Sequence, residues 1–299
     1  MTAISANAVK ELREKTGAGM MDCKRALDET KGNMDEAVDY LRKKGLASAA
    51  KKAGRTAAEG VVSVAVSADG KQAAVAEFNS ETDFVAKNPE FQSLAAELAQ
   101  AVLAGKQDSK AEAITALVAK IGENLVFRRF ETLSVSNGIV ATYIHNQVAP
   151  NLGKIAVLVG LESAGDAAKL QELGKQIAMH IAAAKPTALT RDEVDSSILA
   201  KEKEIFTEQA RQQGKPDNVI EKMVEGRIQK FYGEVVLPEQ IFVMDNKSKV
   251  SDIVAAKAKE IGADIKLAGF KLVILGEGIE KEQTDYAAEV AATVAAAAK

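Results

Sequence analysis

A faint internal repeat constrains the fold of this chain more than any other feature of its sequence. In both copies a Gly–Val or Gly–Ile pair opens one strand, a Gly–Lys pair opens a returning strand, and a helix follows. The first copy covers residues 60–103 and the second covers residues 138–184. A strand that returns after a short connection pairs in the antiparallel sense, and the next helix packs on the resulting sheet. The sequence therefore predicts an α+β protein with two related subdomains, each an antiparallel sheet with one helix packed on it.

Composition limits the core of both subdomains mainly to small aliphatic side chains. The chain has 299 residues, of which 47% are hydrophobic and 27% are charged, as in an ordinary globular protein of two or three domains. Aromatic residues make up only 4% and tryptophan is absent, so Ala, Val, Leu and Ile must supply most of the buried volume. The net charge of -3 argues against broad nucleic-acid binding by the whole chain.

The single cysteine and the hydropathy pattern predict the cellular compartment. Cys23 has no second cysteine with which to form an internal disulfide, and it suits a reducing environment. No apolar run is long enough to span a bilayer. The residues after Met1 lack the basic segment and the apolar core of a signal peptide. We therefore expect a cytoplasmic protein that does not bind membranes.

Residues 1–55 are predicted to form a three-helix domain followed by a basic linker. Ser5 and Asn33 are good N-caps for the first and third helices, and Glu36 completes a capping-box pattern with Asn33. Gly45 is expected to end the third helix. The stretch 43–60 is rich in Ala, Gly and Lys, which is typical of a solvated, flexible connection.

A highly charged segment at about residues 192–232 is predicted to form an antiparallel helical hairpin inserted in the second subdomain. Its helical pattern is broken at Gly214-Lys215-Pro216. Each arm carries a thin row of apolar residues, namely Ile198 and Ile205 on the first arm and Ile220, Val224, Ile228 and Phe231 on the second. So thin an interface indicates that the hairpin packs on the body or on another chain, which includes self-association.

The remainder of the chain is predicted to have mixed structure. We expect a strand at residues 240–244, a helix at 250–261 and a strand at 270–275. Thr284 is a predicted N-cap for a last, alanine-rich helix, with Tyr286 and Val290 on its apolar face. The resulting division of the chain is 1–55 for the N-terminal domain and linker, 56–136 and 137–281 for the two subdomains of the core, and 282–299 for a C-terminal helical module.

The two copies of the repeat differ where the returning strand meets the helix. The first copy carries Thr82-Asp83-Phe84-Val85 there, whereas the second carries a plain polar sequence at residues 162–166. Such a connection lies on the surface and is too short to build its own core. Two readings stay open: either Asp83 sits in a helical turn with Phe84 tucked into the local core, or the segment presents an acid and an aromatic ring to a partner.

Motifs for enzymatic or nucleotide-binding chemistry are missing from the sequence. There is no GxxxxGK[ST] loop, no complete dinucleotide loop, no GxSxG elbow and no HExxH motif. His145 and His180 cannot build a zinc site with one cysteine unless distant carboxylates join them. His180 borders an apolar stripe and is interpreted as structural, whereas His145 ends a strand and is expected to be exposed. We therefore expect no catalytic residue, metal site or cofactor, and interpret the chain as a binding protein.

Five stretches of the sequence resemble the elongation factor Ts family, the guanine-nucleotide exchange factors of elongation factor Tu. They are LREKTGAGMMDCK at 12–24, ETDFVA at 81–86, IGEN at 121–124, AMH at 178–180 and KMVEGR at 222–227. The resemblance covers nearly the whole chain. It implies a UBA-like (ubiquitin-associated-like) N-terminal domain, the two-subdomain core, a coiled-coil hairpin and a C-terminal helical module. Two features depart from some relatives: Ser80 replaces a cysteine, and the loop at 146–152 is longer.

The resemblance also implies a function. The chain would bind elongation factor Tu in its GDP form, disturb the Mg²⁺ and phosphate site of that partner and promote GDP release, without binding nucleotide or metal itself. The residues implied to displace the partner's Mg²⁺ are Thr82, Asp83, Phe84 and Val85. The residues implied to contact the partner are Leu12, Arg13, Met20, Met21, Asp22, Cys23, His145, Tyr286 and Val290. From the sequence alone, Met20 and Met21 either fill a core or form a soft contact surface at a helix start.

Two other classes of function are weighed against this one. An RNA-associated adaptor would use the basic linker to bind phosphates and would show a steep salt dependence of RNA binding. The basic residues concerned are Lys43, Lys44, Lys51, Lys52 and Arg55. The acidic balance of the chain and its lack of aromatic stacking platforms count against this reading. An enzyme would assemble its site from carboxylates scattered along the helices, which screening of carboxylate mutants would reveal.

Overall fold

The computed structural model describes residues 4–280, and its first helices form an N-terminal unit. These helices are α1 (Ala6–Thr16), α2 (Met20–Glu29) and α3 (Met34–Lys52). The side chains of Ser5 and Asn33 accept hydrogen bonds from N–H groups in the first turns of α1 and α3, as predicted. The core of the unit consists of Val9, Leu12, Cys23, Ala26, Leu27 and Ala37. The expected C-terminal module at 282–299, with Tyr286 and Val290, lies outside the described residues.

One boundary in the N-terminal unit was predicted wrongly. Gly45 does not end the third helix, because α3 continues to Lys52 and makes most of the expected linker helical. Gly45 is buried where α3 packs on α5 (Ala111–Ile121), and a Cβ at this position would lie 3.6 Å from the side chain of Ala119. That distance is ordinary van der Waals contact, so Gly45 is a buried position of the helix interface and not a left-handed cap.

The first subdomain packs an antiparallel sheet against α4 (Pro89–Leu103). Its strands are β1 (Glu59–Val66), β2 (Gln72–Ser80), β3 (Val126–Ser134) and the short β5 (Leu152–Gly153), in the order β3-β2-β1-β5. The strand β2 returns along β1, with Ser80 opposite Glu59. On the face covered by α4, the rings of Phe78 and Phe91 stack with centroids 4.4 Å apart. Apolar side chains of β1, β2 and α4 thus share one core.

The second subdomain repeats this plan. Its strands β4 (Gly138–His145), β6 (Ile155–Glu162) and β7 (Lys266–Ile274) form an antiparallel sheet in the order β4-β6-β7. The helix α6 (Ala167–Ala184) packs on one face of this sheet, and α9 (Val250–Ile261) contributes to the same core. The predicted order of strand, returning strand and helix is therefore confirmed in both copies of the repeat.

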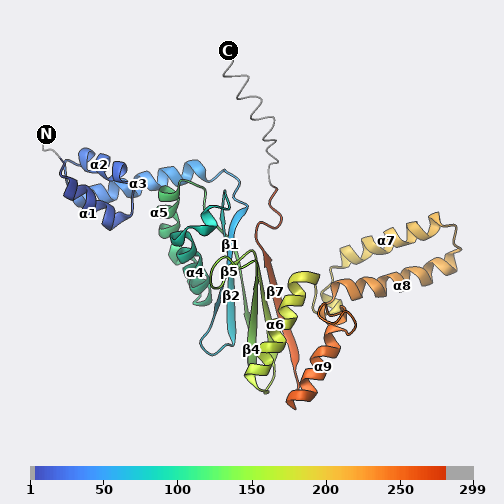
Figure 1. The fold of residues 1–299 in the computed structure, drawn as a ribbon. Helices are drawn as coiled ribbons and strands as arrows, with labels where there is room; N and C mark the ends of the chain where they lie inside the picture. The colour runs from blue at the N-terminus through green and yellow to red at the C-terminus, as the bar shows by residue number, and fades with distance from the viewer. Residues whose placement is uncertain (1–3, 281–299) are drawn as a thin grey trace.

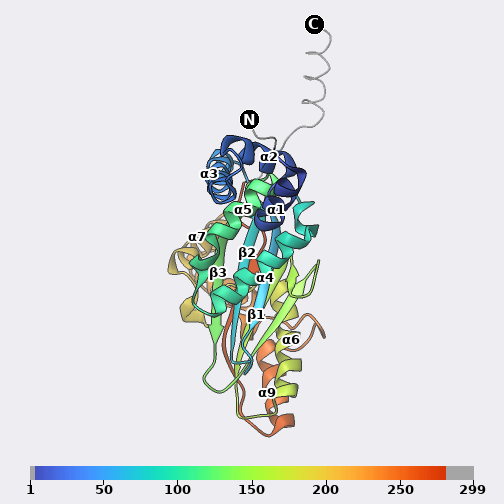
Figure 2. The ribbon, with the colours of Figure 1, turned by 90° about the vertical axis from the view of Figure 1, so that its left-hand side faces the viewer.

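The two sheets pack face to face, with helices on their outer sides (Figures 1 and 2). On one side α4 covers the first sheet, and on the other α6 covers the second. A further core lies between the sheets and consists of Val62, Val64, Ala73, Val75, Val135, Val140, Ala156, Leu158 and Val273. The predicted α+β class is confirmed, and the buried layer between the sheets joins the two subdomains into one body.

The helices α7 (Ser196–Gln212) and α8 (Asp217–Val235) form the predicted hairpin, which projects from the body (Figure 1). On α8, Ile220 and Ile228 are buried, as the apolar pattern predicts. The position of the hairpin leaves most of its surface exposed to solvent. Self-association through the hairpin stays a prediction.

On the first arm of the hairpin the interface was predicted wrongly. Ile198 and Ile205 are 50% and 39% exposed, whereas Ala210 is buried and Phe206 is half-buried. The guanidinium of Arg227 on α8 lies 5.8 Å from the ring centroid of Phe206. The face of α7 that packs on α8 therefore contains Phe206 rather than Ile205, so the predicted apolar row is displaced by one residue.

The strand expected at residues 240–244 does not form. Ile241 makes one isolated bridge to Lys249, and the chain between them turns back on itself. The side chain of Asp245 accepts two N–H groups within this turn, at 3.0 and 3.1 Å. Phe242 is buried in the core of the second subdomain. The apolar pattern here reflects a loop that packs inward rather than a strand.

Short 3₁₀ helices complete the described elements: η1 (Val85–Lys87), η2 (Gln107–Lys110), η3 (Arg191–Glu193) and η4 (Leu237–Glu239). None of the helices within residues 4–280 has both the length and the apolar character that crossing a bilayer requires.

Candidate functional site

The connection from β2 to α4, residues 81–87, projects from the first subdomain and is called the tip segment below. The side chain of Phe84 is 77% exposed, and Asp83 beside it is also exposed. The next two residues, Val85 and Ala86, are buried in the core of the first subdomain. Of the two readings of this segment, the structure supports the exposed one, because the ring of Phe84 is not tucked into the local core.

The tip segment is held at both of its ends. Thr82 donates two hydrogen bonds to the carboxylate of Glu123, from its backbone N–H at 2.9 Å and from its hydroxyl at 2.6 Å. The hydroxyl of Ser80 donates to the carbonyl of Thr82 at 2.8 Å. At the other end the side chain of Asn88 caps α4, which begins with proline as predicted. Phe84 therefore projects from a turn that is ordered on both sides.

The predicted contact residues of the N-terminal unit include several on its surface. Met20 and Met21 occupy the first positions of α2 and are 59% and 67% exposed. Their exposure fits a contact surface at a helix start rather than core filling. Arg13 is exposed as well, and the half-buried Asp22 accepts a hydrogen bond from Lys44 at 2.5 Å.

Leu12 and Cys23 were expected to contact the partner, but the structure buries both completely. They belong to the core of the N-terminal unit, so their side chains support the exposed residues beside them and are not themselves available for contact. Burial raises the pKa of the Cys23 thiol, and a hydrogen bond with Thr16 opposes this rise in part. Sequence analysis missed this division, because exposed and buried residues lie side by side within one motif.

His145 lies at the exposed end of β4, where its Nδ1 is 3.0 Å from the hydroxyl of Tyr143. The carbonyl of His145 accepts the N–H of Lys154 at 3.1 Å. The ammonium of Lys154 in turn lies 3.3 Å from the carboxylate of Glu59, which pairs with Ser80 across β1 and β2. These contacts place His145 at the same end of the two sheets as the tip segment, although the two are far apart in the sequence.

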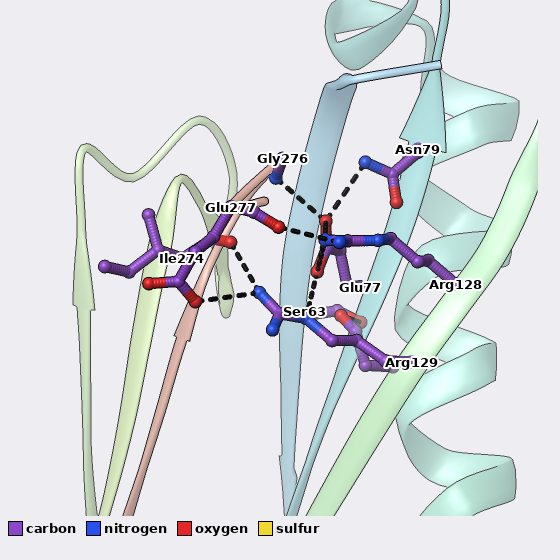
Figure 3. A network of polar contacts seen from close by, with 9 residues as sticks. Ser63, Glu77, Asn79, Arg128, Arg129, Ile274, Gly276 and Glu277 are labelled. Atoms are coloured by element: carbon purple, nitrogen blue, oxygen red, sulfur yellow. Dashed lines mark hydrogen bonds and ion pairs between the residues drawn. The ribbon is translucent and has the colours of Figure 1, made fainter. Parts of the chain in front are cut away.

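A buried ion network beneath the tip segment ties the two subdomains together (Figure 3). Glu77 of β2 is fully buried, and its carboxylate accepts hydrogen bonds from Arg128 at 3.0 Å and from Arg129 at 2.5 Å. It also accepts the N–H of Gly276, just after β7, at 2.8 Å. Arg129 donates further to the carbonyl of Ile274 at 2.8 Å. The strand that leads into the tip segment is thereby fixed to the chain that leaves the second sheet.

The charge of Glu77 is stabilised by this network. Burial by itself would raise the pKa of the Glu77 carboxyl, but the Gly276 N–H, Arg129 and Asn79 together lower that pKa below its usual value. Within residues 4–280, the Oδ1 atom of Asn79 is the buried side-chain polar atom that lacks a hydrogen-bond partner. Sequence analysis missed the network, although an acid inside the apolar run 73–78 was a signal, because a buried acid requires partners.

Two of the five basic residues considered for RNA binding, Lys44 and Arg55, make ion pairs with acids. The ammonium of Lys44 lies 2.5 Å from the carboxylate of Asp22. Arg55 lies 3.5 Å from the carboxylate of Glu81 in the tip segment. Such pairing reduces the positive potential that would attract nucleic-acid phosphates. The structure therefore offers no specific argument for an RNA-binding role of this stretch.

Within residues 4–280, no three His, Cys, Asp or Glu side chains lie together as metal ligands. His180 is buried, with Nε2 at 2.8 Å from Gln240 and Nδ1 accepting the N–H of Val243 at 3.2 Å. His180 is thus a structural histidine, as its place beside an apolar stripe indicated. An exposed ring on a braced turn is, by contrast, an arrangement that can bind another protein.

Comparison with known proteins gives a consistent result over nearly the whole chain. The profile of the family described as "Elongation factor TS" matches residues 81–277, which include the tip segment and Glu123. Elongation factor Ts of Rhodospirillum centenum is 56% identical over 305 residues, covering 97% of this chain and 99% of that relative. Elongation factor Ts of Paramagnetospirillum magneticum is 54% identical, with 98% and 97% covered. Elongation factor Ts of Brucella anthropi is 56% identical, with 97% and 98% covered.

Proposed function

From the premise that this chain belongs to the elongation factor Ts family, and is therefore a translation elongation factor, we propose that it acts as the guanine-nucleotide exchange factor of elongation factor Tu. It works in the cytoplasm, where it binds the GDP form of Tu. It disturbs the site that holds Mg²⁺ and the phosphates, so that GDP leaves and GTP can rebind. The nucleotide and the metal belong to the partner, and this chain contributes no nucleotide site or cofactor.

The exposed ring of Phe84 is the single observation that carries this proposal. A large aromatic side chain that is 77% exposed on an ordered turn gains most of its burial when a partner covers it. Buried aromatic anchors supply a large share of the energy at protein interfaces. Because the turn is fixed before binding, little conformational entropy is lost when the ring enters the partner.

The residues of the tip segment take distinct roles in this mechanism. Phe84 acts as a wedge between helices of the G domain of Tu. The carboxylate of Asp83, next to the wedge, disturbs the groups that hold the partner's Mg²⁺, on which tight binding of the phosphates depends. Thr82 and Val85 keep the turn in shape, the first through hydrogen bonds and the second through burial.

Exchange of this kind requires differential binding and no bond-breaking chemistry by this chain. By linkage, the factor by which this chain weakens GDP binding equals the factor by which GDP weakens binding of this chain. Each tenfold effect requires about 1.4 kcal/mol of differential contact energy. The contacts outside the wedge offset the cost of distorting the partner. The residues proposed for them are Arg13, Met20, Met21, Asp22 and His145, and, outside the described residues, Tyr286 and Val290.

The test is the release of fluorescent GDP from purified Tu, followed with and without this chain. We expect strong acceleration by the unmodified chain and a loss of about 30-fold in catalysed release for Phe84→Ala, as for an interface residue worth about 2 kcal/mol. The control is Phe130→Ala, which removes a ring that is 41% exposed on β3, away from the tip segment. Its exchange rate should be unchanged, and melting curves should show that both variants fold.

Two results would contradict the proposal at different levels. If Tu loses GDP equally fast with and without the chain, the exchange function is wrong. If the unmodified chain accelerates release and Phe84→Ala does so equally well, the chain is an exchange factor but Phe84 is not its wedge.

A further inference from the structure

A pair of acidic side chains, to which the mechanism above gives no role of their own, braces the base of the tip segment. Glu81 lies within the segment, and Glu123 lies in the turn between α5 and β3. We infer that Glu123 is a positioning residue of the exchange site: its carboxylate fixes Thr82 and thereby sets the direction in which Phe84 projects. This inference rests on the proposed function of Phe84.

The contact between Glu123 and Thr82 is specific in geometry. One carboxylate oxygen accepts the backbone N–H of Thr82 at 2.9 Å, and the other accepts its hydroxyl at 2.6 Å. Hydrogen bonds to an ionised carboxylate are stronger than bonds between neutral groups, and two of them together fix orientation as well as distance. Thr82 therefore has both its backbone and its side chain held by one partner.

The turn that carries Glu123 is itself fixed to the tip segment by a second, crosswise bond. The N–H of Asn124 donates to the carboxylate of Glu81 at 2.6 Å. The side-chain amide of Asn124, which is buried, donates to the carbonyl of Arg55 at 2.8 Å. Gly122, in the left-handed conformation with φ 88°, ends α5 and turns the chain toward the tip segment. Two adjacent residues of one loop thus hold two adjacent residues of the other.

The position of this brace explains how it acts on Phe84. The tip segment is anchored after Phe84 by the burial of Val85, and before Phe84 by the bonds of Thr82. Only Asp83 and Phe84 itself lie between the two anchors. If the anchor at Thr82 is removed, this part of the chain gains backbone freedom, and the ordering has to occur when the partner binds.

The contacts of Glu123 set it apart from residues that maintain the fold. Among the hydrogen bonds within residues 4–280, those of its side chain go to Thr82. Its neighbours Asn124 and Leu125 are buried, whereas Glu123 is half-buried and belongs to none of the hydrophobic cores. Removal of its carboxylate therefore leaves the cores of the molecule in place.

The experiment compares Glu123→Ala, Glu123→Gln and a matched control in GDP release from Tu at increasing concentrations of the chain. Glu123→Ala should lower kcat/KM about tenfold, equivalent to about 1.4 kcal/mol. Glu123→Gln should stay within about threefold, because an amide can accept the N–H of Thr82 and donate to its hydroxyl. The control is Glu97→Ala on α4, whose carboxylate lies 2.6 Å from Lys110 and does not contact the tip segment. It should leave kcat/KM unchanged.

A second set of variants separates positioning from a merely structural effect. In a chain that carries Phe84→Ala, the additional change Glu123→Ala should lower kcat/KM by less than about twofold, because a residue that acts through Phe84 has nothing left to position. A residue that acted by maintaining the fold would lower kcat/KM by the same factor in both backgrounds, and would lower the melting temperature as well.

Each outcome of these measurements supports or overturns the inference about Glu123. A tenfold loss for Glu123→Ala that disappears in the Phe84→Ala background supports the inference. Equal losses in both backgrounds, or no loss while Phe84→Ala is impaired, overturn it. If Glu123→Ala does not fold, Glu123 is structural and the inference is overturned. If Phe84→Ala is itself as active as the unmodified chain, the proposed wedge fails, and this result is recognised without any variant of Glu123.

Discussion

The two strand–helix junctions of the repeat occupy equivalent places in their subdomains but differ in exposure to solvent. In the first, β2 leads through the tip segment to α4, and Phe84 is 77% exposed. In the second, β6 leads to α6 through residues 163–166, and Ser163 is buried with its hydroxyl accepting the N–H of Gly165 at 3.0 Å. A Cβ at Gly165 would lie only 2.6 Å from the side chain of Ile261 on α9. The second junction is therefore closed against its own subdomain.

The two junctions differ in the kind of contact that holds them. Both end in a capped helix, because Asn88 caps α4 and Asp166 caps α6. The second packs closely against Ile261 of α9, whereas the first protrudes and is held at Thr82 by hydrogen bonds to Glu123 in another loop. A repeated fold thus supplies a place for a contact site, and a protruding loop at that place needs an anchor from elsewhere in the chain.

The largest effect on GDP release is expected when the first junction is given the residues of the second. The combined substitutions Thr82→Ser, Asp83→Ala and Phe84→Gly introduce the sequence found at 163–165. Since they remove the ring and the acid together, we expect GDP release to slow by about 100-fold or more. The measurement is fluorescent GDP release at a saturating concentration of the chain. Unchanged release, with a normal melting curve, would show that the contrast between the junctions has no functional meaning.

The next largest effect is expected at the network beneath the first junction. Glu77→Gln removes the negative charge that compensates two arginines. We expect a loss of about 2 kcal/mol in the free energy of unfolding. This loss is smaller than for a fully buried ion pair, because both arginines are partly exposed. Urea denaturation measures this loss. The control Glu131→Gln affects a partly exposed carboxylate 2.8 Å from Lys271 and should cost less than about 0.5 kcal/mol. Equal losses would contradict a special role of the network.

A smaller effect should mark the closed packing of the second junction. Gly165→Ala places a methyl group against Ile261, so we expect a loss of about 1 kcal/mol from overpacking, with exchange activity unchanged. Gly226→Ala is the matched control, because a Cβ within α8 meets no atom within 4 Å there, and alanine favours a helix. It should be neutral or slightly stabilising. A stable Gly165→Ala variant would show that the second junction is looser than its contacts indicate.

The smallest effect concerns the pH dependence of the second subdomain. Burial lowers the pKa of His180, and the hydrogen bond with Gln240 opposes this in part. Below about pH 6.5 the unfolded chain therefore binds more protons than the folded chain, so the free energy of unfolding falls as the pH drops toward the lower, folded pKa. Above this range both states are neutral and His180 adds no pH dependence.

Urea denaturation between about pH 5 and pH 7.5 tests this sign. The variant His180→Gln lacks the titrating group, so its stability should depend less steeply on pH over the same range. Exchange at neutral pH should be the same for both, because His180 lies in the core of the second subdomain and not in the tip segment. A steeper dependence in the variant would contradict the assignment.

Much of this architecture could be predicted because the pattern that encodes it is local. The caps at Ser5, Asn33 and Asn88 depend on residues within one turn, and the repeat depends on glycine and apolar spacing within about 45 residues. The sequence predicted that the tip segment lies on the surface, because so short a connection cannot build its own core. Whether the ring of Phe84 is exposed or buried in the local core could be decided only from the structure. Val85, its neighbour, is the residue that turns inward.

The features that could not be predicted all depend on distant partners. Gly45 lies inside a helix that packs on α5. Phe242 belongs to a loop that packs into the core, not to a strand. Leu12 and Cys23 share a motif with exposed residues, and only the packing of three helices separates them. Glu123 and Thr82 are likewise distant in the sequence, and nothing in either loop indicates the other.

The bond between Glu77 and Gly276 joins residues that are 199 positions apart. As the nascent chain leaves the ribosome, the carboxylate of Glu77 emerges long before the amide that completes its surroundings. Until then the acid remains in water, because its burial without all its partners is unfavourable. The surroundings of the strand that leads into the tip segment are therefore completed only after Gly276 has been synthesised.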